Sequence, residues 1–170
     1  MAPRLARQAS LALEVVSPLA IDLDGALGDT RPLWDAWLES ASRVLGIDAD
    51  SLPLDRGAAA AELDRAGVGN WGTLLERFAE DRAPVHLRRD ADVGTALRAL
   101  AADGYELGVF TDAPEPLARV ALDQLGAARR IVALETGTAA LERLRERLGP
   151  DTVVVRTGAE LVRYASTPAS

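Results

Sequence analysis

The amino-acid sequence predicts an α/β fold, an open parallel sheet of about four strands with flanking helices. Two observations lead to this prediction. Short apolar runs alternate along the chain with longer segments in which apolar residues recur every three or four positions. Each short run ends in polar residues, and glycine or proline separates many of the segments. Strands and helices that alternate in this way are typical of a parallel sheet.

Four short segments are the expected strands. Each is mostly apolar and is bounded by polar or turn-forming residues, which fits a strand that is buried on both faces. The segments are residues 18–23 (PLAIDL), 105–112 (YELGVFTD), 131–134 (IVAL) and 152–155 (TVVV).

The segments between these strands have helical periodicity. In residues 29–46, Leu33, Trp37 and Leu45 belong to a set of apolar residues at three- and four-residue spacing, and Gly46 suits the end of a helix. Residues 47–56 have the composition of a loop. The remaining helices are expected at 57–67, 71–80, 90–102, 114–125, 139–148 and 159–164.

The composition excludes several classes of function. The chain has 170 residues, a formal net charge of −7 and a pI near 4.8, which argues against a nucleic-acid partner. It has no cysteine, and His86 is its one histidine, which argues against thiol ligands and clustered-histidine metal sites. No apolar stretch is long enough to cross a bilayer, so we expect no membrane partner and a cytoplasmic location. All 19 basic residues are arginine, which suggests a GC-rich bacterial genome.

The two ends of the chain lie outside the expected sheet. Residues 1–16 contain a short amphipathic segment, and we expect it to form a helix packed on the core. Residues 166–170 are expected to be a frayed tail.

Polar residues follow the first two strands, at the edge of the sheet where parallel α/β folds bind ligands. Asp22 and Asp24 follow the first strand, and in such a pair one carboxylate can act as nucleophile and the other as general acid and base. Gly25 permits a sharp exit of the chain and a close approach of the backbone to a ligand. Thr111 offers a hydroxyl and a backbone N–H to a phosphoryl oxygen. Taken alone, the two aspartates are equally compatible with a solvated loop.

Two segments resemble motifs of the haloacid dehalogenase superfamily. IDLDGALGDT is similar to the first motif, and VFTDAPEPLARVALDQLGA is similar to the second. Members of this superfamily are Mg²⁺-dependent aspartyl phosphatases and their relatives on a Rossmann-like fold. The resemblance covers most of residues 17–165. It implies a core of residues 17–27 and 89–165, with a small helical cap, residues 28–88, inserted after the first strand.

The resemblance also implies roles for individual residues. Asp22 is at the position of the nucleophile, Asp24 at that of the acid and base, and Thr111 at that of the phosphate-binding hydroxyl. Gly25 and Asp112 adjoin the phosphate site, although Asp112 is also placed to cap the helix that begins near residue 114. In an active member, Asp22 and Asp24 contribute to Mg²⁺ binding, and the substrate is a small phosphorylated metabolite.

The third and fourth motifs depart from the family pattern. The third requires a lysine or arginine after the third strand, but the first arginine there, Arg143, lies inside a predicted helix. The fourth requires Gly-Asp and a further acid, but Arg156 and Thr157 take the place of Gly-Asp, and Glu160 is the one carboxylate nearby. Because protein-bound Mg²⁺ is held through carboxylate oxygens, these changes weaken or remove the metal site. We expect the Arg156 guanidinium to pair with Asp22 or Asp24 in place of the metal; a surface position for Arg156 is the alternative.

Three functions remain open at this point. The first is a phosphatase-like hydrolase that is weak or catalytically impaired, with Mg²⁺ required only if it is active. The second is a non-catalytic binding or interaction protein of the same fold. The third is an active Mg²⁺-dependent phosphate monoester hydrolase that uses Glu160 as a substitute metal ligand. Arg31 is a candidate contact for an anionic substrate, and the expected open edge at the fourth strand is compatible with a homodimer or another protein partner.

Overall fold

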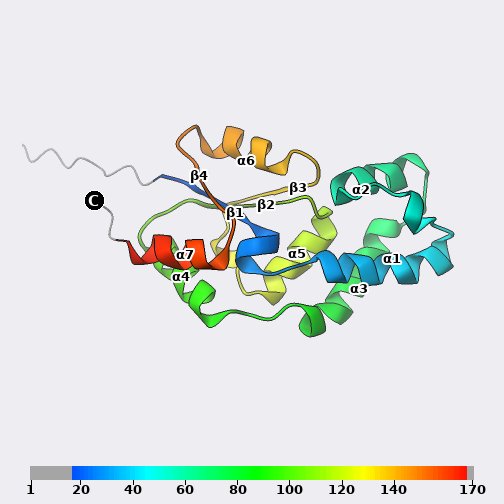
Figure 1. Ribbon diagram of the computed structural model, residues 1–170, viewed down its shortest axis with the longest axis horizontal. Coiled ribbons are helices and arrows are strands. Elements are labelled where there is room, and N and C mark those ends of the chain that lie inside the picture. Colours follow the sequence, from blue (N-terminus) through cyan, green and yellow to red (C-terminus); the bar gives the residue numbers. More distant parts are fainter. Residues whose placement is uncertain (1–16, 168–170) are drawn as a thin grey trace, which may run out of the picture.

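The computed structural model describes residues 17–167, so the predicted helix within residues 1–16 and the last three residues lie outside the described part. The chain forms a four-stranded sheet with helices on both faces (Figure 1). In sequence order the elements are β1 (Leu19–Asp22), η1 (Leu23–Leu27), α1 (Arg31–Leu45), η2 (Ala49–Ser51), α2 (Arg56–Arg65), α3 (Trp71–His86), α4 (Ala91–Ala102), β2 (Leu107–Thr111), α5 (Glu115–Gln124), η3 (Ala128–Arg130), β3 (Ala133–Thr136), α6 (Ala140–Leu148), β4 (Val153–Val155) and α7 (Gly158–Ser166).

The sheet has the strand order β3-β2-β1-β4, and every pair of neighbours is parallel. Strand β1 is central, since Ile21 lies opposite Val109 of β2 and Val155 of β4. The predicted parallel sheet of four strands is therefore confirmed. Strand β3 begins two residues later than expected, because its pairing with β2 starts where Ala133 lies opposite Gly108.

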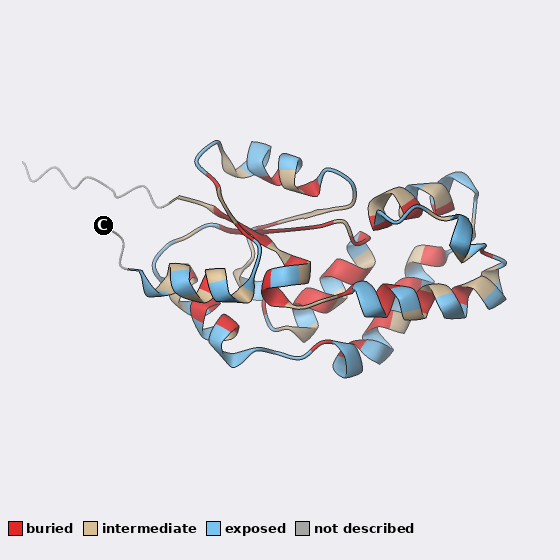
Figure 2. Cartoon of the chain, viewed as in Figure 1, coloured by how far each residue is buried: buried red, intermediate tan, exposed pale blue. Residues whose placement is uncertain are grey.

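Alternate residues of the strands pack against different layers. Leu19 and Ile21 of β1 belong to the larger core beneath the sheet, towards α4, α5 and α7, while Ala20 faces the smaller core under α6. A Cβ added to Gly108 would lie 2.8 Å from the Leu144 side chain, so this glycine lets α6 pack closely on the sheet. The strands and the inward sides of the helices are correspondingly buried (Figure 2).

Helices α1, α2 and α3, called the cap helices below, fall within the segment expected to form a cap and lie to one side of the sheet (Figure 1). Three tryptophans fill the cap interior: the ring centroids of Trp34 and Trp37 are 5.2 Å apart, and those of Trp37 and Trp71 are 6.0 Å apart. Helix α3 runs past Pro84, beyond its predicted end. Proline there removes one hydrogen bond near the helix terminus, and the last turn still closes through the Leu87 N–H and the Ala83 carbonyl.

Two other boundaries differ from the predictions. Helix α2 begins at Arg56, which the sequence analysis assigned to a loop, because the Asp55 carboxylate caps its first turn by accepting a hydrogen bond from the Ala58 N–H. Helix α7 extends to Ser166, so the expected tail starts later than predicted. No helix within residues 17–167 is both long and apolar enough to span a membrane.

Gly25 marks the place where the chain after β1 touches the chain after β4. A Cβ at this position would lie 2.2 Å from the Arg156 carbonyl oxygen. The absence of a side chain therefore lets the end of β4 approach the turn that carries Asp24.

We predict that Gly25→Ala lowers the free energy of unfolding by about 2 kcal/mol, because the backbone of the facing loop must move to accept the methyl group. Gly72→Ala in α3 is the matched control. Its added Cβ meets only Pro116 Cγ at 3.9 Å, and it should leave stability unchanged or raise it by up to about 1 kcal/mol. Urea unfolding of both variants tests the prediction, and equal stabilities would contradict the close approach.

Candidate active site

The predicted pair of aspartates lies where β1 ends and the chain turns. Asp22 is the last residue of β1, and Asp24 follows in the turn η1. The Asp22 Oδ1 atom accepts a hydrogen bond of 3.1 Å from the Asp24 N–H. The two carboxylates therefore belong to one short turn at the ligand-binding edge of the sheet.

Both oxygens of the Asp24 carboxylate are fully engaged by other groups. Oδ1 accepts hydrogen bonds from the N–H and the hydroxyl of Thr30, at 2.7 and 2.5 Å. Oδ2 accepts from the Thr111 hydroxyl at 2.7 Å and from Arg56 Nη2 at 2.6 Å. The structure thus brings Thr111 to Asp24, as a hydrogen-bond donor to that carboxylate.

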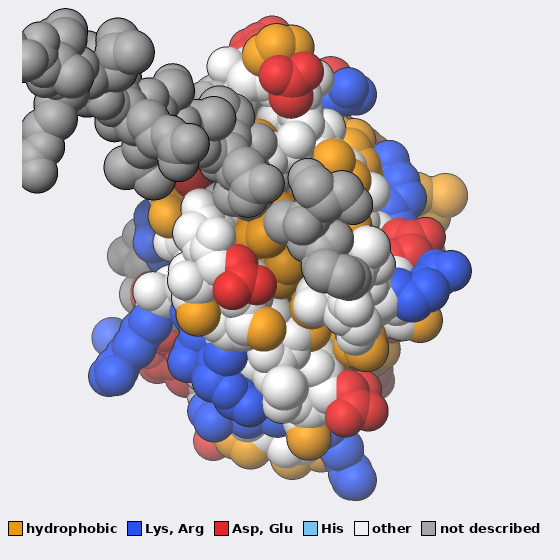
Figure 3. All heavy atoms as spheres, turned by 90° about the vertical axis from the view of Figure 1, so that its left-hand side faces the viewer, with side chains coloured by type: hydrophobic (Ala, Val, Ile, Leu, Met, Phe, Trp, Pro, Cys, Tyr) orange, Lys and Arg blue, Asp and Glu red, His pale blue; other side chains and the backbone are white. Residues whose placement is uncertain are grey.

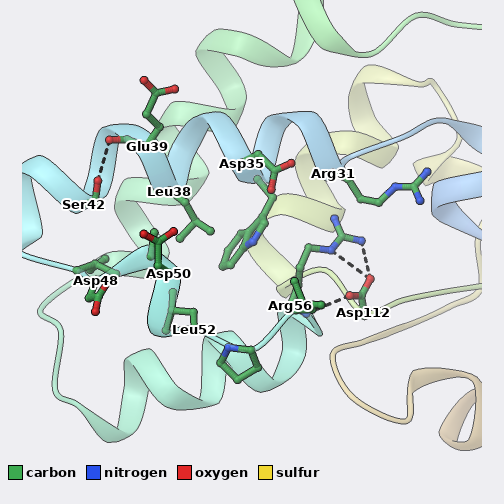
Figure 4. Close-up of a pocket in the computed structure, with 15 residues that line it drawn as sticks. Arg31, Asp35, Leu38, Glu39, Ser42, Asp48, Asp50, Leu52, Arg56 and Asp112 are labelled. Carbon is green, nitrogen blue, oxygen red and sulfur yellow. Dashed lines mark hydrogen bonds and ion pairs between the residues drawn. The ribbon is translucent and has the colours of Figure 1, made fainter.

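Arg56 is the central cation of the site, and it comes from the cap. Its side chain is only 4% exposed, yet it reaches two core carboxylates: Nη2 lies 2.6 Å from Asp24 Oδ2 and 2.6 Å from Asp112 Oδ1. Nε and the backbone N–H of Arg56 also donate to Asp112, at 3.1 and 3.0 Å, and Nη1 donates to the Thr30 hydroxyl at 2.7 Å. Figure 4 shows the Arg56 guanidinium directed at the Asp112 carboxylate.

The start of α2 is held against the core by two further contacts. A Cβ added to Gly57 would lie 2.2 Å from the Thr138 N–H nitrogen, so the helix start touches the loop before α6. The Thr138 hydroxyl donates to the Asp55 carboxylate at 2.9 Å. Together with the Arg56 bonds, these contacts fix the first turn of α2 to the core.

Arg56 is not among the site residues predicted from the sequence. The family pattern places a cation after β3, whereas Arg56 lies about eighty residues earlier in the chain, in a segment predicted to be a loop. The available signal was Asp55, a helix-capping residue directly before Arg56 and Gly57. The expectation that Asp112 caps α5 is wrong, because that helix has Pro114 at its N-cap without a side-chain bond, and the Asp112 carboxylate binds Arg56.

Arg156 follows β4 and faces Asp22. Its Nη1 lies 3.7 Å from Asp22 Oδ2, which is an ion-pair distance without a direct hydrogen bond. The guanidinium carbon also stands 5.5 Å from the centre of the Phe110 ring, where the ring face attracts a cation. The Arg156 side chain is 58% exposed, so its attraction to Asp22 is screened by water.

Glu160, the proposed substitute metal ligand, is used to start α7. Its Oε2 accepts hydrogen bonds from the backbone N–H groups of Arg156 and Thr157, at 2.8 and 3.2 Å. The Thr157 hydroxyl accepts in turn from the Glu160 N–H, which completes a capping box. The structure therefore directs this carboxylate oxygen to the helix terminus.

Arg31 lies at the start of α1 and forms a two-pronged ion pair with Asp29. Its Nε and Nη2 are 2.7 and 2.9 Å from the two Asp29 carboxylate oxygens. It also lines an open groove of about 750 Å³ between α1 and the segment before α2 (Figure 4). Arg56 and Asp112 close one end of this groove, while neither Asp22 nor Asp24 lines it.

The surroundings shift the pKa values of the carboxyl groups in opposite directions. Burial, together with the negative charge of Asp24, raises the pKa of Asp22 despite the opposing backbone hydrogen bond and Arg156. Burial acts in the same sense on Asp24, but the Arg56 charge and the bonds from Thr111 and Thr30 outweigh it and lower the pKa of Asp24. Hydrogen bonds from Arg56 likewise hold the pKa of Asp112 below its usual value.

The described residues do not fit a Mg²⁺ ion. Within residues 17–167, no three carboxylate or histidine side chains are grouped so that they could hold a metal. Asp24 has both oxygens occupied by donors, Arg156 brings a positive charge to Asp22, and Glu160 is bound to backbone amides. A cation at Asp22 would have to displace or tolerate Arg156.

We predict that Arg56→Met destabilises the protein by about 3 kcal/mol. The Asp24 side chain is only 11% exposed, and the substitution removes the cation that neutralises its charge. Arg65→Met is the control on the same helix. Arg65 pairs with Glu62 at the surface, and its loss should cost less than about 1 kcal/mol. Denaturant unfolding compares the two variants, and a loss for Arg56→Met no larger than the control would refute this role.

We predict that acidification destabilises the protein through Asp24 and Asp112. Because their folded pKa values lie below the ordinary 3.8, their stabilisation is complete above that pH and is lost as the pH falls further. Asp22 has the opposite sign: its raised pKa favours the folded state below 3.8, and that contribution is lost as the pH rises.

Unfolding free energies measured between about pH 5 and pH 2 test these signs. Asp24→Asn should be less stable at neutral pH and should show a shallower decline on acidification. Asp22→Asn should show a steeper decline than the unchanged protein. The exposed Asp81→Asn is the control and should follow the unchanged protein. If the unfolding free energy of the unchanged protein and of all three variants changed with pH at the same rate, the assigned pKa shifts would be excluded.

The sequence matches no protein-family model and no curated protein significantly. Solved structures with similar folds include CbbY from Rhodobacter sphaeroides in complex with phosphate, with a TM-score of 0.60 and 15% identity over 89% of this chain and 84% of that one. A HAD phosphatase from Thermococcus onnurineus has a TM-score of 0.51 and 21% identity over 88% and 83% of the two chains. A haloacid dehalogenase-like hydrolase from Streptococcus pneumoniae has a TM-score of 0.52 and 13% identity over 89% and 81%. The chain therefore has the haloacid dehalogenase fold.

Proposed function

We propose that this protein is a phosphatase-like member of the haloacid dehalogenase superfamily in which phosphoryl transfer is weak or lost. The observation that carries the proposal is the position of Arg56, whose Nη2 lies 2.6 Å from both Asp24 and Asp112. Its charge is committed to the protein's own carboxylates instead of being available to a substrate. The resemblance places Asp22 as nucleophile and Asp24 as acid and base, and both roles are limited by this arrangement.

Asp24 is poorly suited to donate a proton. A general acid works best when its pKa is near the working pH, but the pKa of Asp24 is lowered. Its two oxygens also accept four hydrogen bonds, which stabilise the ionised form. Protonation of a leaving group by Asp24 would require the loss of part of this network.

Asp22 is more accessible but lacks sufficient positive charge around it. Its side chain is 24% exposed, and a carboxylate at this position can attack a phosphoryl group. The incoming phosphate is itself negative, so catalysis depends on cations that neutralise it. The carboxylates and guanidiniums at the site form an ion network, whose members are Asp22, Asp24, Asp112, Arg56 and Arg156. Three negative and two positive groups give this network a net charge of −1 before any substrate enters.

Arg156 is the residue through which a phosphorylated ligand would be held. It is the exposed cation of the network, whereas Arg56 is buried. The structural neighbour CbbY was solved with phosphate, which supports a small phosphorylated metabolite as the ligand class. We infer that Arg156 takes over part of the charge of a metal, and no step at Asp22 or Asp24 is assigned to Mg²⁺.

A non-catalytic binding protein is the second candidate, and the cap groove favours it. A groove of about 750 Å³ is within the size range of sites for small molecules. It lies beside the ion network and is lined in part by Trp34 and Leu38. A ligand could therefore occupy the groove without reaching Asp22.

Hydrolysis of an aryl phosphate, measured with Mg²⁺ and with a chelator, tests the proposal. Because the loss of one electrostatic contributor commonly costs about 10²–10³ in rate, two losses should leave turnover near the background. We expect no increase on addition of Mg²⁺. We also expect Asp22→Asn to remove any residual turnover above background, because Asp22 is the assigned nucleophile. The exposed Arg145→Ala serves as the surface control.

Arg156→Gly combined with Thr157→Asp restores the acidic residue of the fourth motif. This variant should bind Mg²⁺ more tightly than the unchanged protein in a calorimetric titration. Mg²⁺-dependent turnover in the unchanged protein that Asp22→Asn abolishes would overturn the proposal. Turnover that persists in Asp22→Asn would show that the assigned nucleophile does not carry it.

A further inference from the structure

A second cavity, lined by neither Asp22 nor Asp24, is bordered by three arginines. It has a volume of about 250 Å³ and lies between the start of α4 and the end of α5. Arg89 comes from the segment that returns from the cap, Arg98 from α4, and Arg130 from η3. Three cations from separate elements thus meet around one small cavity in a chain whose net charge is −7.

None of these three arginines has a carboxylate partner within 4.0 Å among residues 17–167, whereas several other arginines do. Arg89 Nε donates to the Gln124 carbonyl at 2.8 Å, and Arg130 Nη1 donates to the Gly126 carbonyl at 3.2 Å. The bond to Gln124 is favourable because Gln124 is the last residue of α5, and the end of a helix carries partial negative charge. Both bonds fix the two guanidiniums beside the cavity, while each retains further N–H groups for a ligand.

Arg98 is the third arginine of the lining, and Asp90 is its one acidic residue. Arg98 Nη2 donates to the Thr95 hydroxyl at 2.9 Å, which holds it along α4. Asp90 caps α4, since its Oδ1 accepts from the N–H groups of Asp92 and Val93 at 2.8 and 3.1 Å. The Asp90 charge is therefore directed to the helix start, and the guanidiniums remain the dominant charges of the cavity.

The floor of the cavity is apolar. Leu27, Val93 and Leu97 are buried and line it. A ligand that suits this combination has an anionic group for the arginines and a small apolar part for the floor. On the face drawn in Figure 3, arginine side chains gather towards the lower left, with acidic side chains elsewhere on the same face.

We propose that this cavity is a binding site for a small organic oxyanion, a molecule with a phosphate, phosphonate or carboxylate group on a compact apolar body. Guanidinium groups bind such oxyanions through paired hydrogen bonds. The site shares no lining residue with the ion network of Asp22, Asp24 and Arg56. It therefore does not depend on whether the protein hydrolyses phosphate esters.

The test is a titration of the ¹⁵N-labelled protein with phenylphosphonate, which has no hydrolysable ester bond. Backbone amide signals of Gly94, Thr95 and Gly126 report on this cavity, and those of Gly25 and Thr111 report on the ion network. We expect saturable shifts at the first group. Benzoate should produce the same pattern, and benzyl alcohol, the neutral analogue, should not.

Arg98→Ser should weaken binding by about tenfold, because a charged hydrogen-bond donor is lost. Arg98→Lys should lose less affinity than Arg98→Ser, because it keeps the charge but not the paired hydrogen bonds. The surface variant Arg145→Ser should bind as the unchanged protein does. Arg98 is exposed, so its substitution is compatible with folding.

Four outcomes would overturn the proposal. They are shifts that do not saturate, shifts confined to Gly25 and Thr111, equal binding of benzyl alcohol, and unchanged affinity in Arg98→Ser. Shifts confined to Gly25 and Thr111 would still support a ligand at the ion network, so the failure of this proposal is distinguishable from that of the proposed function.

Discussion

The bonds of Arg56 to Asp24 and Asp112 are the interaction on which the candidate site depends. The Arg56 side chain is only 4% exposed. Removing its charge from water costs free energy unless carboxylates and hydrogen-bond acceptors inside the protein replace the lost contacts with water. Asp24, Asp112 and the Thr30 hydroxyl together supply that compensation. The same bonds join the start of α2 to the ends of β1 and β2, so one side chain contributes both to the position of α2 and to the charge balance of the site.

The cations and hydrogen-bond donors of the site contact the protein's own carboxylates. In an enzyme that transfers a phosphoryl group, cations and donors must be directed at the substrate. Here the Arg56 guanidinium and the Thr111 hydroxyl are directed at Asp24, and the Asp22 carboxylate meets the exposed Arg156. These contacts within the protein are the basis of our proposal that turnover is weak or lost.

Much of the fold could be predicted because it depends on local patterns. Apolar runs and helical periodicity located the four strands and most helices. The strand ends singled out Asp22, Asp24 and Thr111 as candidates, and the structure joins Thr111 to Asp24 by a hydrogen bond. Arg56 could not be found in this way. Its role arises from a contact between residues 56 positions apart in the chain, and a single arginine in a polar segment has no periodic signature. The two-residue error in β3 has a similar origin, because pairing with β2 decides where that strand begins.

We propose that the Arg156 guanidinium takes over part of the charge of a metal at Asp22. Mn²⁺ is paramagnetic and substitutes for Mg²⁺ at oxygen ligands, so it broadens the amide signals of residues beside a bound ion. A Mn²⁺ titration of the ¹⁵N-labelled protein should therefore leave the signals of Gly25 and Thr111 no more broadened than those of remote surface residues. Saturable broadening at Gly25 and Thr111 that disappears in Asp22→Asn would contradict the account.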